Sequence, residues 1–184
     1  MKNFIEIIIK YRAFVGIVSL IAILYLSEPS PPSVAAGFFL ILAGMFFRAW
    51  AAGYISKDTV LATKGPYSLT RNPLYFGNFV LGIGIAVSGN NLYSYGIFFG
   101  YYLLFFPFLM ALEHRRLTNQ FGDQYKVWSE KSHSFFPKLK RVKEKDRDFN
   151  ISYYMKNKEY RVLYFSLFII AIMILKVLKI IRTY

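Results

Sequence analysis

Long apolar blocks separated by short polar segments dominate this chain. The blocks cover residues 13–26, 34–55, 73–87, 92–112 and 160–181. The first becomes long enough to cross a bilayer when residues 4–10 join it, because Lys10 and Arg12 can extend their charged ends to the interface. A cleaved signal peptide is the competing interpretation, but residues 27–32 lack a small-residue cleavage pattern. The pattern therefore predicts an all-α integral membrane bundle of about five transmembrane helices.

The polar segments differ in their content of Lys and Arg. Residues 27–33 and 88–91 contain none, whereas the N-terminus, the 56–72 connector and residues 113–160 hold nearly all of them. Because positively charged segments stay on the cytoplasmic side, we expect the connector and the basic segment on the cytoplasmic face of the cytoplasmic membrane. The last apolar block fits poorly, because Lys176 and the basic residues after it would lie outside. It either spans against the rule or lies partly in the interface.

The third and fourth predicted helices form a hairpin. Residues 88–91 (Ser-Gly-Asn-Asn) make a tight turn between them, so the start of one helix neighbours the end of the other. This brings Arg71, just before the third helix, close to Glu113, at the end of the fourth. A carboxylate is electrostatically disfavoured at a helix C-terminus, which favours a functional reason for Glu113. Arg48, inside the second span, either faces a cavity or extends to the interface.

A separate amphipathic helix is expected over residues 113–130. Its apolar side chains recur every three to four positions, at Leu117, Phe121, Tyr125 and Trp128. We interpret its aromatic residues, and Trp50, as packing and interface anchors, and His114 as a solvated interfacial residue. The basic tract at 138–147 is expected to lie on lipid headgroups.

Composition narrows the class of protein and of site. The chain has 184 residues, of which 55% are hydrophobic, and a net charge of +13. Without a nucleic-acid recognition motif, this charge fits anionic lipid headgroups better than DNA or RNA. The lack of cysteine excludes disulfides and thiolate metal sites, and His114 and His133 are too few for a histidine metal site. We therefore expect one membrane domain over residues 1–184, surrounded by membrane lipids and without a metal.

The candidate chemistry centres on a polar, proline-punctuated turn before the third helix. Its sequence is Gly65-Pro66-Tyr67-Ser68-Leu69-Thr70-Arg71-Asn72-Pro73-Leu74-Tyr75-Phe76-Gly77. Irregular backbone at a membrane edge is tolerated only where protein or a water-filled site receives its polar groups. Arg71 can fork a carboxylate, and Glu113 can bind an amine or a ribose diol. These two residues, the predicted catalytic pair, can together hold a zwitterionic cofactor.

Several motifs in fixed order resemble the isoprenylcysteine carboxyl methyltransferase family, which is related to the phospholipid N-methyltransferases. The matching residues are Lys64 to Tyr67, Arg71 to Gly77, Gly82 with Gly84, Glu113, Leu117, Phe121 to Tyr125, and Pro137. The resemblance covers roughly residues 48–139 as a methyltransferase-like core, and residues 140–184, with the basic tract and the last apolar helix, have no counterpart. It implies an integral membrane enzyme that takes its methyl group from S-adenosylmethionine.

The resemblance also implies a cofactor site. Carried over by position, the cofactor-binding residues are Thr59, Val60, Leu61, Ala62, Tyr67, Asn72, Pro73, Leu74, Tyr75, Gly82, Gly84 and Glu113. Three positions depart from the family pattern. Asn72 replaces a histidine, His114 replaces the second glutamate of a pair, and Leu109 replaces an arginine that contacts the substrate. The change at Leu109 argues against a prenylcysteine carboxylate as the acceptor.

On these grounds we expect methyl transfer from S-adenosylmethionine to a lipophilic small-molecule or lipid acceptor, either a carboxylate or an amine. Two other function classes stay open. A membrane reductase that uses a nicotinamide cofactor would share the architecture, although the chain has no dinucleotide-binding signature. A non-catalytic membrane adaptor would account for Asn72 and His114.

Overall fold

The computed structural model describes residues 2–55, 60–138 and 149–181, and these residues form helices and connecting loops without any strand. The elements in chain order are α1 (Lys2–Leu26), α2 (Pro31–Ala52), the 3-10 helix η1 (Gly65–Ser68), α3 (Pro73–Gly89), α4 (Leu92–Lys131), α5 (Ile151–Lys156) and α6 (Tyr160–Val177). The all-α prediction is confirmed. Thr59 and the basic tract after Lys138 lie outside the described residues.

The helices are those of an integral membrane protein. Within the described residues, α2, α4 and α6 are long and apolar enough to cross a membrane, and α3 is a shorter apolar helix. Large apolar side chains such as Phe39, Phe46 and Phe168 are exposed on the outside of the bundle, where lipid rather than water can surround them. A helical membrane bundle is therefore confirmed, with three of the expected spans meeting the criteria of length and composition.

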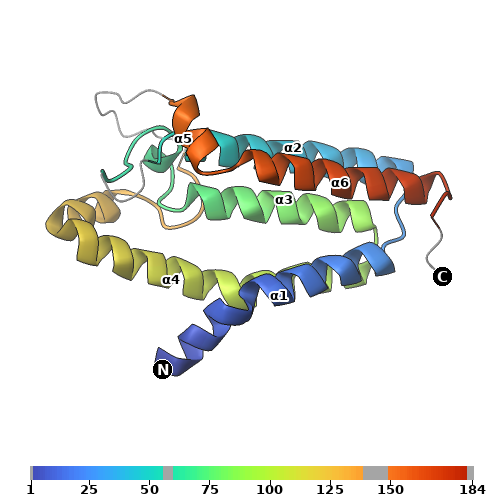
Figure 1. The fold of residues 1–184 in the computed structure, drawn as a ribbon, viewed down its shortest axis with the longest axis horizontal. Helices are drawn as coiled ribbons and strands as arrows, with labels where there is room; N and C mark the ends of the chain where they lie inside the picture. Colours follow the sequence, from blue (N-terminus) through green and yellow to red (C-terminus); the bar gives the residue numbers. More distant parts are fainter. Residues whose placement is uncertain (1, 56–59, 139–148, 182–184) are drawn as a thin grey trace.

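The backbones of α2 and α3 touch through paired glycines. A Cβ atom added at Gly44 would lie 2.7 Å from the carbonyl oxygen of Gly77, and one added at Gly84 would lie 2.8 Å from that of Gly37. Glycines at such contacts let two helices approach until their main chains meet, which is a common way of packing helices in lipid. In Figure 1, α3 lies in the middle of the bundle, with α2 and α6 above it and α1 and α4 below it.

The loops that join the spans follow local capping rules. Ser30 caps α2, and prolines occupy the first two helical positions, so α2 begins at Pro31 rather than at the predicted Val34. The predicted turn after α3 is confirmed. Asn90 adopts a left-handed conformation with φ of 55°, and the Asn91 side chain accepts a hydrogen bond from the Ser94 amide at 2.8 Å.

The fourth helix does not end at Leu112 as predicted. It continues through the amphipathic segment to Lys131 and is interrupted only at Gly122, whose φ of 54° and ψ of −127° are not helical. Between Leu112 and Gly122 the chain contains no glycine or proline, so nothing local stops the helix. The break at Gly122 turns residues 123–131 back toward the preceding turns, so the boundary between the two helical segments lies at Gly122 rather than at the predicted Leu112.

The last helix packs along α2 and is tied to α1 at its far end (Figure 1). The Lys176 ammonium donates hydrogen bonds to the carbonyl oxygens of Leu24 at 2.8 Å and Ser27 at 2.6 Å, which stand at the C-terminus of α1. A cation is stabilised by the unpaired carbonyls and the negative dipole end of a helix. Lys176 therefore has a partner within the protein.

Candidate functional site

A small aromatic cluster closes the end of the bundle where η1, the start of α3 and the second half of α4 meet. Its buried residues are Ala51, Leu61, Tyr67, Tyr125 and Trp128, and Ala62, Leu74, Leu117 and Phe121 are partly buried against it. The predicted apolar face of residues 113–130 is thus confirmed. The structure also brings together four residues of the predicted cofactor set from separate parts of the chain, namely Leu61, Ala62, Tyr67 and Leu74.

Glycine is required where the motif turn begins. Gly65 has a φ of +57°, and a Cβ atom there would lie 2.6 Å from the ring of Tyr54. The next residue, Pro66, starts η1 and is buried together with Tyr67 and Ser68. The sequence Gly-Pro-Tyr therefore places the Tyr67 ring in the cluster.

The irregular backbone between η1 and α3 is held by the segment that follows α4. Residues 69–72 bond residues 133–138 through both main chain and side chains. The bonds are Arg71 N to His133 O (2.8 Å), Lys138 N to Leu69 O (2.8 Å), Thr70 Oγ1 to Phe135 O (2.8 Å) and Asn72 Nδ2 to Ser134 O (2.7 Å). Thr70 is fully buried. The polar groups of the turn are thus received by protein, as expected at a membrane edge.

Arg71 and Glu113 both lie near Tyr125, because both charges act on the pKa of its phenol and the Arg71 side chain also forms a hydrogen bond to it. The Nε atom of Arg71 is buried without a hydrogen-bond partner among the described residues. Glu113 is about one-third exposed and lies 3.9 Å from the Arg116 guanidinium. Because α4 continues to Lys131, Glu113 is in mid-helix, and the argument from a helix C-terminus was wrong.

Burial and charge keep the two cluster tyrosines protonated. Burial raises the pKa of Tyr67, and the negative charges of Glu113 and Glu159 raise it further against the opposing effect of Arg48. Burial also raises the pKa of Tyr125, which Arg71 lowers and Glu113 raises. Both phenols therefore remain hydrogen-bond donors at neutral pH.

His114 has a partner that sequence reasoning missed. Its Nδ1 atom lies 3.0 Å from the Tyr125 hydroxyl, although the imidazole is largely exposed. The contact exists because the chain folds back at Gly122. A glycine inside an otherwise helical pattern was the signal that could have revealed it.

Of the remaining predicted cofactor residues, some lie beside the cluster and others lie away from it. Pro73 is buried at the first position of α3, and Tyr75 packs edge-on against Phe106 with ring centroids 5.7 Å apart, next to the cluster. Val60 is exposed. Gly84 instead packs against α2, and a Cβ atom at Gly82 would overlap the Phe98 ring. Helix packing thus accounts for both glycines, apart from the cluster.

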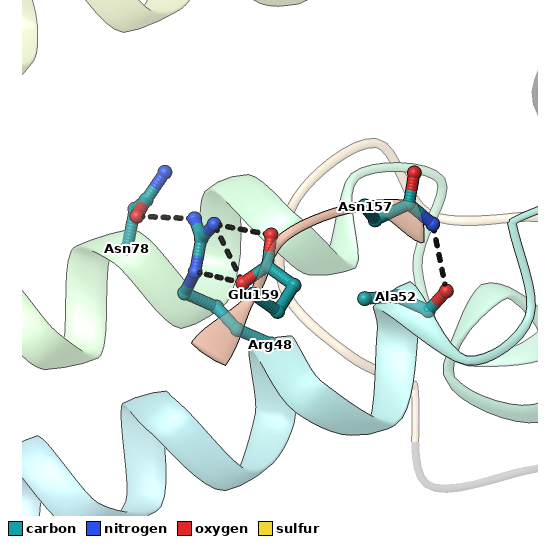
Figure 2. A network of polar contacts seen from close by, with 5 residues as sticks. All are labelled: Arg48, Ala52, Asn78, Asn157 and Glu159. Atoms are coloured by element: carbon teal, nitrogen blue, oxygen red, sulfur yellow. Dashed lines mark hydrogen bonds and ion pairs between the residues drawn. The ribbon is translucent and has the colours of Figure 1, made fainter. Parts of the chain in front are cut away.

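A buried polar network connects the C-terminal helices to the core (Figure 2). The Arg48 guanidinium donates to Glu159 through Nε at 3.0 Å and Nη2 at 2.7 Å, and to Asn78 Oδ1 through Nη1 at 2.5 Å. Arg48 and Glu159 are 12% and 9% exposed. Asn157 Nδ2 donates to the Ala52 carbonyl at 3.0 Å. Arg48 is therefore paired within the protein, an outcome that neither open alternative named.

A cavity of about 360 Å³ lies between α1, α3 and α4. Its walls include Gly82, Phe98, Tyr102 and Phe106, and Asn78 also lines it. The Tyr102 hydroxyl, on α4, donates to the carbonyl oxygen of Tyr75 at 3.2 Å. This bond joins the cavity wall to the first turn of α3. Among the described residues, no group of three or more His, Cys, Asp or Glu side chains is placed to hold a metal ion.

Comparison with known proteins gives one family match and two relatives. The phospholipid methyltransferase family matches residues 32–124, which run from α2 to the break in α4. The chain is 34% identical over 94 residues to the nickel-cobalt-cadmium resistance protein NccN of Alcaligenes xylosoxydans xylosoxydans, covering 50% of the chain and 44% of the relative. It is 30% identical over 112 residues to the cobalt-zinc-cadmium resistance protein CzcN of Cupriavidus metallidurans, covering 60% of the chain and 51% of the relative. The chain thus spans about half the length of these relatives, and no solved structure matches it.

Proposed function

This chain belongs to the phospholipid methyltransferase family, and from that premise we propose that it transfers a methyl group from S-adenosylmethionine to a lipophilic acceptor in the membrane. The observation that carries the proposal is the buried, unpartnered Nε of Arg71. A desolvated guanidinium donor without an acceptor is costly unless a ligand supplies one. Arg71 lies inside the matched segment and beside the same tyrosine as Glu113.

Residues in and beside the cluster fit the chemical groups of S-adenosylmethionine. Arg71 can fork its carboxylate, and the partly exposed Glu113 can accept hydrogen bonds from its ammonium or its ribose hydroxyls. Tyr67 and Tyr75 offer aromatic faces, which attract a cationic sulfonium. The proposed binding set further contains Thr59, Val60, Leu61, Ala62, Asn72, Pro73 and Leu74, and we leave Gly82 and Gly84 out because helix packing accounts for both.

The chain's part in the reaction is to bind, align and desolvate. When bound, S-adenosylmethionine supplies an electrophilic methyl group on a positively charged sulfur. Because charge disperses in such a displacement, an aromatic, water-poor site that aligns the two reactants supplies much of the rate. A carboxylate acceptor would need no base, and Arg71 would orient it or the cofactor. For an amine acceptor, Glu113 or His114 would receive the proton.

The site faces the cytoplasm in this proposal. The connector of residues 56–72 and residues 113–160 contain most of the Lys and Arg of the chain. Their described parts meet at one end of the bundle, where residues 69–72 bond residues 133–138. S-adenosylmethionine is made in the cytoplasm, so a site on this face would have access to it.

The two relatives are named for metal resistance, and we propose that any such role of this chain is indirect. Methylation of a membrane component changes its charge or hydrogen bonding, and thereby the attraction of the surface for cations. Metal sensitivity of cells that carry only Glu113→Gln, compared with wild type, would test this link.

The proposed function is tested by titrating the detergent-purified chain with S-adenosylmethionine and with NADPH in a calorimeter. We expect saturable binding of S-adenosylmethionine alone, followed by incorporation of labelled methyl into an extracted lipophilic product. Saturable binding of NADPH would favour the reductase. A folded protein that binds neither compound would favour the adaptor and overturn the proposal.

A further inference from the structure

The cavity between α1, α3 and α4 combines apolar walls with few polar groups. Its aromatic wall is formed by Phe98, Tyr102 and Phe106, and among the described residues no Asp, Glu, Lys or Arg lines it. Asn78, which lines the cavity, stands one helical turn after Tyr75 on α3. The cavity therefore begins about one turn beyond the residues of α3 that border the cluster. A lipophilic molecule in this cavity would therefore lie next to the proposed cofactor residues.

The tyrosine hydroxyls of the cavity have already used their donor hydrogens. Tyr101 donates to the carbonyl oxygen of Arg12 at 3.3 Å, and Tyr102 donates to that of Tyr75 at 3.2 Å. A hydroxyl has only one hydrogen to donate. Among the described residues, the donors that remain in the cavity wall are the hydroxyl of Ser19 and the amide nitrogen of Asn78.

The orientation of Asn78 is fixed by Arg48. An arginine side chain can only donate, so the atom of Asn78 that faces it at 2.5 Å must be the oxygen Oδ1. Figure 2 shows the amide nitrogen of Asn78 pointing away from Arg48, and it has no hydrogen-bond acceptor among the described residues. Glu159 holds Arg48 from its other side. The C-terminal helices thus determine which atom Asn78 offers to the cavity.

We propose that this cavity binds the methyl acceptor and that Asn78 is its specificity-determining residue, donating from Nδ2 to an oxygen of the acceptor. The inference rests on the proposed function and narrows the acceptor to a lipophilic molecule with a carboxylate or hydroxyl oxygen. An ammonium group has only hydrogens to present to this donor, and among the described residues no carboxylate lines the cavity to balance its charge. The hydroxyl oxygens of Ser19, Tyr101 and Tyr102 can accept a hydrogen bond but carry no charge, so burying an ammonium in this apolar cavity is costly and disfavours an amine.

The test uses three photoactivatable probes with the same sixteen-carbon chain, about the length of a membrane acyl chain: a fatty acid, an alcohol and an amine. Each is crosslinked to the full chain in lipid nanodiscs, and labelled peptides are identified by mass spectrometry. We expect the acid or the alcohol to label α1, α3 and α4 residues of the cavity, and the amine to label them about tenfold less. Labelling by the acid alone would specify a carboxylate.

Asn78→Asp replaces the donor with an acceptor of the same shape. It should reverse the preference, lowering labelling by the acid about tenfold and raising labelling by the amine. Asn119→Asp, the same change at an exposed position on α4, should leave the pattern unchanged. If the Asp variant does not fold, Asn78→Ala should abolish the discrimination between acid and amine.

Equal labelling by all three probes would overturn the proposal, because the cavity would then hold any lipid chain. Labelling outside the cavity, or an unchanged pattern in both Asn78 variants, would also overturn it. Binding of S-adenosylmethionine is measured calorimetrically on the same preparation. If the chain does not bind S-adenosylmethionine but the probes label the cavity as expected, the proposed function alone is refuted. If it binds S-adenosylmethionine but the probes label other residues, the cavity proposal alone is refuted.

Discussion

Arg48 Nη2 lies 2.7 Å from Glu159 Oε1, although 111 residues separate the two along the chain. Arg48 is inside the segment that matches the family and Glu159 is outside it. Both charges are nearly buried, so each is the main reason that the other is tolerated there. The helices after residue 149 are therefore bonded to the family core as part of one folded unit.

Removing one charge of this pair should destabilise the protein strongly. Glu159→Gln leaves the Arg48 guanidinium buried without its counter-ion, and we expect a loss of about 3–5 kcal/mol in unfolding free energy. Denaturant unfolding in detergent measures this, with the exposed Glu130→Gln as control. The double variant Arg48→Met/Glu159→Leu should recover most of the loss, and a double variant no more stable than Glu159→Gln would contradict this account.

Glu113→Gln should weaken binding of S-adenosylmethionine without unfolding the chain. The carboxylate is partly exposed, and a charge-assisted hydrogen bond to a ligand contributes about 1.5–3 kcal/mol, so the dissociation constant should rise at least tenfold. Calorimetric titration measures the change. Glu130→Gln is the matched control on the same helix, and equal affinity of both variants would remove Glu113 from the site.

Arg71→Gln should abolish cofactor binding at a cost of about 1 kcal/mol in unfolding free energy. The buried Nε of Arg71 has no partner in the described structure, and the bond that the fold loses is the one between the Arg71 side chain and the Tyr125 phenol. The exposed Arg115→Gln should change neither property. A destabilised Arg71→Gln that still binds S-adenosylmethionine would indicate a structural role instead.

Gly84→Ala should loosen the α2–α3 contact. The added methyl group would lie 2.8 Å from the backbone oxygen of Gly37, which cannot move without shifting a helix, so we expect a loss of about 1–3 kcal/mol. Gly96→Ala, at a helical position with nothing within 4 Å, should stabilise α4 by about 0.5–1 kcal/mol. Unfolding midpoints of the two variants should move in opposite directions.

Lys176→Met should free the C-terminus of α1. Methionine keeps the apolar stem but cannot donate to the carbonyls of Leu24 and Ser27. Amide hydrogen exchange in the residues that follow α1 should become faster, whereas Lys131→Met, on the exposed end of α4, should leave it unchanged. Unaltered exchange in Lys176→Met would show that α1 does not depend on this cap.

The sequence by itself determined the helical membrane class, the apolar face of residues 113–130, the Gly-Pro-Tyr turn and the family. Each follows from local patterns, namely hydrophobic runs, helical spacing and residues with restricted backbone angles. The tertiary structure decided what the polar residues do: that Arg48 binds Glu159, that Gly84 serves the contact with α2, that α4 continues past Glu113, and that His114 meets Tyr125. Buried charges, glycine contacts and folded-back turns join residues that are distant along the chain. Their partners depend on how the helices pack, and no local pattern carries that information.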